Sequence, residues 1–200
     1  MISNSKVFKE VENAISNLSS SISQCKNLSV LILHLQCKNL NEQSLREIVT
    51  SFSNCKKLQT LELYISQNNF KDIEATCLGS GLGNCLGHIR IHSAFSKHQE
   101  SLEFVSCLRI EIQEKGASAL GQGLENCKNL EALSVSLYTN NIRKQGISNL
   151  SSSLANCLKL KYLLLNLGQD DFSLRGSEIN FKNALKKIKK LVQLKTSFSF

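Results

Sequence analysis

Three of the four histidines and one cysteine lie close together in the middle of the chain. They are spaced Cys85-x-x-His88-x-x-x-His92, with His98 six residues further on. Thiolate and imidazole are ligands that zinc prefers, and His88 and His92 have the i, i+4 spacing of one helical face. No second cysteine pair completes a recognised zinc pattern. We therefore favour loop histidines beside a buried cysteine and predict no metal site.

The chain contains serine, histidine and aspartate, but no motif places a nucleophile beside a base. It has no G-x-S-x-G elbow, no H-E-x-x-H and no kinase catalytic loop. The glycine-rich run 79–83 is superficially similar to a phosphate-binding loop, which needs a strand before it and a helix after it. Its apolar neighbours Leu78, Leu82 and Cys85 instead place it inside a helix. The sequence predicts neither an enzyme nor a cofactor.

The net charge of +8 is concentrated near the end of the chain, where the last twenty residues contain six lysines and no acid. Such lysines bind phosphates in nucleic-acid complexes, with an affinity that falls as salt rises. Aromatic residues for base stacking do not alternate with them, and their spacing is that of a solvated helical face. Nucleic-acid association is unlikely on these grounds and is kept as an alternative function of Lys182, Lys186, Lys187, Lys189, Lys190 and Lys195.

The elements that would position these residues follow from a repeat of about thirty residues. Its marker is a cysteine with similar neighbours, at Cys25, Cys55, Cys85, Cys127 and Cys157. In the clearest unit, 130–157, apolar residues recur first every second residue and then every third or fourth. This change of period predicts a strand, a turn and a helix. Each unit has an apolar side that only its neighbours can bury, so the units are predicted to stack.

The pattern Leu130-x-x-Leu133-x-Val135-x-Leu137-x-x-Asn140 resembles the leucine-rich repeat in its long, ribonuclease-inhibitor-like form. The resemblance covers nearly the whole chain and implies an α/β solenoid, a horseshoe with a concave parallel sheet and convex helices. It also implies a ladder of asparagine amides bonded to the backbone of the turns and of the next unit. Asn68 and Asn140 occupy the ladder position, whereas Asp170 and Lys38 replace it.

We expect a single domain over 1–200. Residues 1–24 form an N-terminal helical cap, 25–175 the repeats, and 176–200 a basic C-terminal cap with a short strand near 192–198. Between Cys85 and Cys127 the interval lengthens to 42 residues, which predicts an insertion near 86–101. We expect the strand of this unit within 102–110, where the apolar residues allow two registers that differ in which side chains point inward. A further interpretation is that this stretch is a wrongly joined segment of a predicted gene.

Five of the eight cysteines recur at one repeat position and no C-x-x-C pair occurs, which favours reduced, buried thiols over disulfides. The first residues are too polar for a signal peptide, and no stretch reaches about 18 consecutive apolar residues. The sequence predicts a cytoplasmic protein, possible also in the nucleus, that does not bind a membrane.

The predicted function is non-catalytic binding of another protein by the concave sheet face. The residues between the leucines point to this face, and tyrosine is typical of interface hot spots. The resemblance implies an alternative, a GTPase-activating or kinase-associated repeat segment of a larger system. The candidate partner-binding residues are Ile32, His34, Glu62, Tyr64, Ser134, Ser136, Tyr138, Tyr162, Leu164 and Asn166.

Overall fold

Helices and strands alternate along the chain. The computed structural model describes residues 4–35, 40–65, 68, 70–82, 88–92, 112–137, 140–167 and 177–197. Within these residues six helices and six strands follow one another as α1 (Asn4–Gln24), β1 (Val30–His34), α2 (Glu42–Phe52), β2 (Thr60–Tyr64), α3 (Asp72–Leu82), β3 (His88–His92), α4 (Glu114–Glu125), β4 (Ala132–Ser136), α5 (Arg143–Ala155), β5 (Tyr162–Asn166), α6 (Ser177–Leu185) and β6 (Gln193–Ser197).

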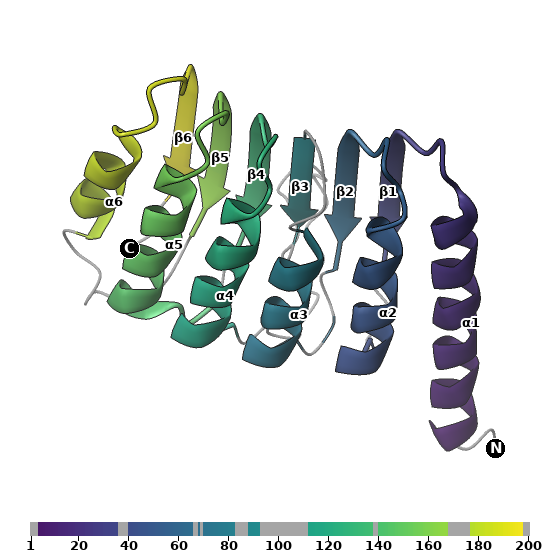
Figure 1. Ribbon diagram of the computed structural model, residues 1–200. Helices are drawn as coiled ribbons and strands as arrows, with labels where there is room; N and C mark the ends of the chain where they lie inside the picture. Colours follow the sequence, from purple (N-terminus) through teal and green to yellow (C-terminus); the bar gives the residue numbers. More distant parts are fainter. Residues whose placement is uncertain are drawn as a thin grey trace, which may run out of the picture.

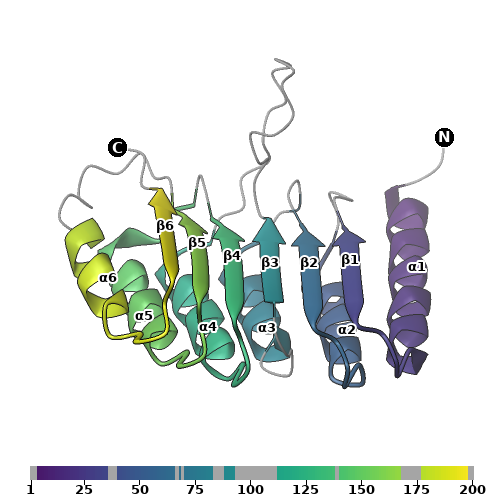
Figure 2. The ribbon, with the colours of Figure 1, turned by 90° about the horizontal axis from the view of Figure 1, so that it is seen from above.

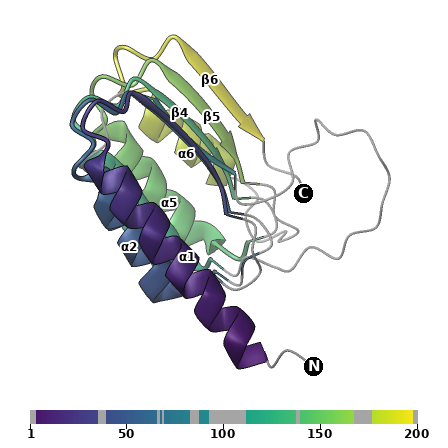
Figure 3. The ribbon, with the colours of Figure 1, turned by 90° about the vertical axis from the view of Figure 1, so that its right-hand side faces the viewer.

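The strands form one parallel sheet in sequence order, β1 to β6 (Figure 1). The helices form a second layer behind it, all on the same side of the strands (Figures 2 and 3). Each strand is in register with the next, as in the pairs Leu31 with Leu61 and Leu133 with Leu163. The predicted mixed α/β class with parallel strands is confirmed.

The core lies between the sheet and the helix layer. Alternate strand residues point into it, so Leu61, Leu63 and Val135 are each 1% exposed. Burial of one such side chain contributes about 1.5–3 kcal/mol. The largest fully buried side chains include Phe52 of α2, Phe181 of α6 and Phe70, which lies between β2 and α3.

The recurrent cysteines lie directly after the helices, where backbone carbonyls lack helical partners. The Cys55 thiol donates to the carbonyl of Ile22 at 3.4 Å, and the Cys127 thiol donates to that of Leu82 at 2.9 Å. Each thiol therefore joins its own unit to the end of the preceding helix. The described cysteines are all free, as predicted, but Cys25 is exposed rather than buried.

The buried asparagines after β2 and β4 hold the turns together. Asn68 is 0% exposed; its amide donates to the carbonyls of Leu35 at 2.5 Å and Ile65 at 2.9 Å, and its oxygen accepts from the N–H of Leu40. Asn140 likewise accepts from the N–H of Ile112 at 2.9 Å. The bonds with Leu35, Leu40 and Ile112 reach back to the preceding unit, and the bond with Ile65 lies within the turn itself. Asp170 and Lys38 lie outside the described residues.

The predicted position of the third strand is wrong. β3 is His88–His92, inside the segment 86–101 that was expected to be an insertion, and it pairs with β2 and β4. The physical reason is visible in the sequence, because Leu86, Ile89 and Ile91 repeat the spacing of Leu58, Leu61 and Leu63. In the sequence the interval from the recurrent cysteine to the first of these leucines is two residues shorter, which hid the match. The segment 102–110 lies outside the described residues.

β3 also changes the interpretation of the histidines. His88 and His92 lie at the two ends of an extended strand, so their spacing is not that of a helical face. Cys85 and His98 lie outside the described residues. In the described part of the chain no group of three or more metal-ligating residues occurs.

The glycine-rich run forms the end of α3, as predicted for 79–82. Its small residues allow adjacent helices to approach closely: a Cβ on Gly123 of α4 would collide with the backbone carbonyl of Gly79. The start of α4 is held by Asp72 of α3, whose carboxylate accepts hydrogen bonds from the N–H groups of Gln113 at 2.7 Å and Gly116 at 2.9 Å. Both features bind α4 to α3.

The two ends of the chain follow the predicted elements. α1 (Asn4–Gln24) lies within the residues 1–24 for which a helix was predicted. β6 (Gln193–Ser197) is the short strand expected near 192–198. Among the described residues no helix combines the length and the apolar character needed to cross a bilayer.

Candidate binding surface on the strands

One face of the sheet has no described helix against it. The side chains that β2 and β4 present to this face are partly exposed, whereas their alternate residues are buried on the other side, and β5 presents two exposed side chains. The parallel register aligns these residues in rows that cross the sheet. We call this surface the strand face; its described members are Val30, Ile32, His34, Thr60, Glu62, Tyr64, Ala132, Ser134, Ser136, Tyr162, Leu164, Asn166, Gln193 and Lys195.

Nine of the ten predicted binding residues lie on the strand face. The register pairs Ile32 with Glu62 and Ser134 with Leu164 in one row. A second row pairs His34 with Tyr64, and Ser136 with Asn166. β3 continues these rows through the backbone positions 90 and 92. The tenth residue, Tyr138, lies outside the described residues.

A stack of two rings occupies the β1–β2 end of the strand face. The rings of His34 and Tyr64 are 4.2 Å apart between centroids and inclined by only 2°. The Tyr64 hydroxyl donates to the carboxylate of Glu62 at 3.4 Å. Stacking and this hydrogen bond restrict the three side chains, so a partner would meet a preorganised surface.

Exposed apolar side chains lie at both ends of the strand face. Val30 and Ile32 are each 52% exposed at β1, and Tyr162 and Leu164 are 48% and 42% exposed at β5. The side chains of β4 between them are small. A single exposed apolar residue is normal on a protein surface, whereas contiguous ones often mark a contact site. Each of these two pairs lies on the same face of one strand, so the two pairs are candidate contact points.

Residues of β6 were missed as part of this surface. Lys195 is exposed and its Cα pairs with that of Leu164, so a cation extends the row that contains Leu164. The sequence placed Lys195 in a basic tail, although the alternation in Gln193-Leu194-Lys195 is the same signal that identifies the other strands. Nucleophile–base pairs are absent from the described strand face, which offers rings, hydroxyls, aliphatic groups and charges.

No family model matches the chain, and no curated protein sequence matches it. A solved structure of the leiomodin-1 actin-binding site 2 is similar to it, with a TM-score of 0.54 and 13% identity over 91% of this chain and 89% of that chain. The tropomodulin C-terminal domain of Caenorhabditis elegans is similar with a TM-score of 0.55 and 9% identity, over 88% and 92% of the two chains. At these identities the likeness concerns the fold.

These structures correct the family resemblance drawn from the sequence. The two similar structures named above are a leiomodin site and a tropomodulin domain and not ribonuclease-inhibitor-like leucine-rich-repeat proteins, so that assignment is wrong. The leucine pattern led to the wrong family because it indicates only that strand–helix units stack in parallel. This packing requirement is not specific to one family. The basis for expecting GTPase activation or kinase association falls with it.

Proposed function

We propose that this protein is a non-catalytic binding module that contacts another protein with its strand face. The observation that carries the proposal is the exposure of Val30, Ile32, Tyr162 and Leu164 on one rigid sheet. Their neighbouring strand residues, Leu33, Leu163 and Leu165, are buried in the core, which holds the exposed side chains in place. Rigid anchors bind with a small loss of conformational entropy.

The strand face is suited to binding and not to chemistry. Three of its polar side chains engage one another, since the Tyr64 hydroxyl donates to Glu62 and the His34 ring stacks on that of Tyr64. Tyrosine and aliphatic side chains surrounded by hydroxyls and charges are typical of interface hot spots with a polar rim. No cofactor is required by this proposal.

Actin is the first partner to test, because one of the similar structures is titled as an actin-binding site. The measurement is co-sedimentation of the purified chain with filamentous actin. In the test variant, Tyr162→Ser and Leu164→Ser remove the anchors at β5. In the matched control, Ile73→Ser and Ile179→Ser remove two exposed apolar side chains of the helix layer, which are 58% and 66% exposed.

We expect the wild type and the control to co-sediment and the strand-face variant to bind at least about tenfold more weakly, as hot-spot truncation does. Loss in the control with retention in the test variant would move the binding site to the helices. No binding by the wild type would reject actin. The same two variants then serve as references in affinity capture, in which a partner lost only from the strand-face variant is expected.

The proposed location is the cytoplasm. The described cysteines are free, and the thiols of Cys55, Cys127 and Cys157 are buried, a state that a reducing compartment preserves.

A further inference from the structure

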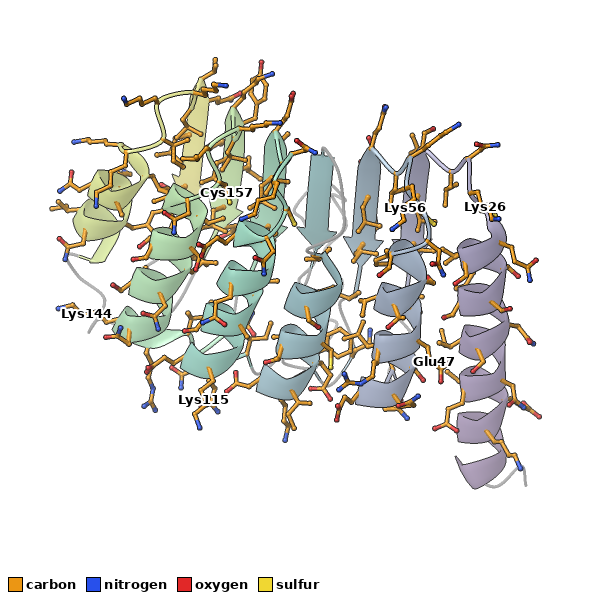
Figure 4. The ribbon with its side chains drawn as sticks, in the orientation of Figure 1. Lys26, Glu47, Lys56, Lys115, Lys144 and Cys157 are labelled. Carbon is orange, nitrogen blue, oxygen red and sulfur yellow. The ribbon has the colours of Figure 1, made fainter. Side chains whose placement is uncertain are left out.

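A row of lysines runs along the edge of the molecule where each helix turns into the next strand. We call it the lysine edge and define it as the exposed residues Lys26, Lys56, Lys57, Lys128, Lys159, Lys189 and Lys190. Lys26 and Lys56 lie on this edge in Figure 4, whereas Lys115 and Lys144 lie on the opposite one. The last twenty residues supply only two of the seven, so the row is not confined to the end of the chain.

The turns hold these lysines in equivalent positions. In the turn after α2, the buried residues Cys55 and Leu58 enclose Lys56 and Lys57, and the N–H of Leu58 donates to the carbonyl of Cys55 at 2.9 Å. Equivalent bonds close the turns that begin at Cys25, Cys127, Cys157 and Ile188. Two residues per turn are thereby held out into solvent, and most of them are lysines.

Side-chain contacts link the first of these turns to the second and the turn at Cys127 to the turn at Cys157. The Lys57 ammonium donates to the side chain of Asn27 at 2.9 Å, thirty residues earlier, and Lys159 donates to Asn129 at 2.5 Å. Among the described residues, no carboxylate pairs with a member of the lysine edge. The nearby acids bind elsewhere: Glu131 pairs with Lys161 at 2.9 Å, and Glu125 accepts from Asn156 at 3.0 Å.

Stabilisation of the helix ends accounts for the row only in part: the Lys128 ammonium donates to the carbonyl of Glu125, the last residue of α4, at 3.3 Å. A cation that complements the helix dipole acts from the last turn, and its effect falls off beyond it. The last turns of α1 to α5 contain no basic residue, since the lysines follow the helices. At the opposite edge charges of both signs mix, with Asp72, Glu74 and Glu114 in the first turns of their helices. One edge alone is uniformly cationic.

Two exposed aliphatic residues interrupt the lysines. Leu158 takes the position that Lys56 and Lys128 occupy in their turns and is 73% exposed. Val192 is 74% exposed, and its N–H donates to the carbonyl of Lys161 at 2.7 Å, directly beside Tyr162 of the strand face. The lysine edge is therefore continuous with the proposed binding surface at β5 and β6.

We propose that the lysine edge binds an acidic, leucine-containing segment of the partner protein; this inference rests on the proposed function. Carboxylates along such a segment would meet the ammonium groups, and its apolar side chains would meet Leu158 and Val192. Nucleic acid fits less well, because no aromatic side chain on the edge offers a base a stacking platform. Like-sign charges in a row also accelerate association with an oppositely charged partner.

The test measures binding of a fluorescent glutamate-rich peptide containing two leucines, by fluorescence anisotropy at low salt. The edge variant carries Lys56→Gln, Lys128→Gln and Lys189→Gln. The matched control carries Lys71→Gln, Lys115→Gln and Lys144→Gln, which change the net charge equally on exposed helix-side lysines. Circular dichroism and the urea midpoint establish that both variants are folded.

We expect the edge variant to bind the peptide at least about tenfold more weakly and the control to stay within about twofold of the wild type. A further variant, Leu158→Ser, is expected to weaken binding of the leucine-containing peptide and to leave binding of a leucine-free polyglutamate unchanged. Equal losses in the edge variant and the control would overturn the proposal. Tighter binding of an oligothymidine or of phosphatidylserine vesicles than of the peptide would overturn the partner class.

The two proposals fail separately. If the wild type and the Tyr162→Ser, Leu164→Ser variant bind the acidic peptide equally while actin does not bind, the actin hypothesis falls and the lysine edge stands. If actin binding depends on the strand face and the peptide does not bind, the lysine edge falls alone.

Discussion

At the scale of single residues, the recurrent cysteine is a small apolar side chain with one weak donor. In Cys157 the thiol donates to the carbonyls of Leu124 at 3.6 Å and Ser153 at 3.8 Å. Burial, together with the carboxylate of Glu125, raises the pKa of this thiol to about 11, although Lys128 acts in the opposite direction. The protonated thiol is thus the form that the folded protein stabilises.

Stability should therefore fall at alkaline pH through Cys157. The thiol of the unfolded chain has a pKa near 8.5. The stability that comes from the raised pKa of Cys157 is therefore fully present below about pH 8 and is lost as the pH rises from there to about 11. This loss amounts to about 3 kcal/mol in the free energy of unfolding. Urea unfolding of the wild type and of Cys157→Ser, which keeps a donor but does not titrate, measures it. The advantage of the wild type should shrink between about pH 7.5 and 10.5 by about 2 to 3 kcal/mol. Parallel pH profiles would contradict this assignment, and Ser152→Ala is the control for general alkaline effects.

At the scale of the elements, glycines set the distance between α3 and α4. Glycine normally weakens a helix interior by about 1 kcal/mol relative to alanine. Here that cost is outweighed, because the backbones of Gly79 and Gly123 lie where side chains would otherwise separate the helices. Gly116 similarly leaves room for the Asp72 carboxylate that accepts its N–H.

Gly123→Ala is expected to destabilise the fold by about 3 kcal/mol or more, since overpacking against a backbone carbonyl cannot be relieved by a side-chain rotation. The matched variant Gly121→Ala lies on the same helix, where a Cβ would meet Leu150 and Ser153 at 3.2 Å. Its cost should stay within about 1 kcal/mol because these contacts can yield slightly and helix propensity improves. Urea unfolding compares the two. Equal effects would mean that the helix spacing is not set by Gly123.

At the scale of the whole molecule, α1 covers one end of the helix layer. Ile15 and Ile22 are 6% and 5% exposed, and the Ser16 hydroxyl donates to Glu47 of α2 at 2.6 Å. That bond and a second one from Gln43 lower the pKa of the Glu47 carboxyl. These contacts attach α1 to the helix layer. That residues 1–24 act as the cap that a parallel array needs at its end stays a prediction.

Ile22→Ala tests the cap. Removing its buried methyl groups should lower the free energy of unfolding by about 2–4 kcal/mol and increase binding of a hydrophobic dye. The exposed Ser21→Ala on the same helix should leave stability within about 0.5 kcal/mol. If Ile22→Ala lowers stability no more than Ser21→Ala, α1 contributes little to the array and the cap prediction is wrong.

The sequence by itself determined the alternating strands and helices, because two local periods and a recurrent cysteine report which side of each element is buried. It also determined which residues face away from the core, including His34, Tyr64 and Tyr162, since side chains on a strand alternate. What only the tertiary structure decided depends on contacts between units. The third strand is recognised at 88–92 only once Ile89 pairs with Leu61 and Leu133. The seven lysines become one edge only when the turns are stacked. A local pattern specifies the unit, whereas the packing of units decides which distant residues share a surface.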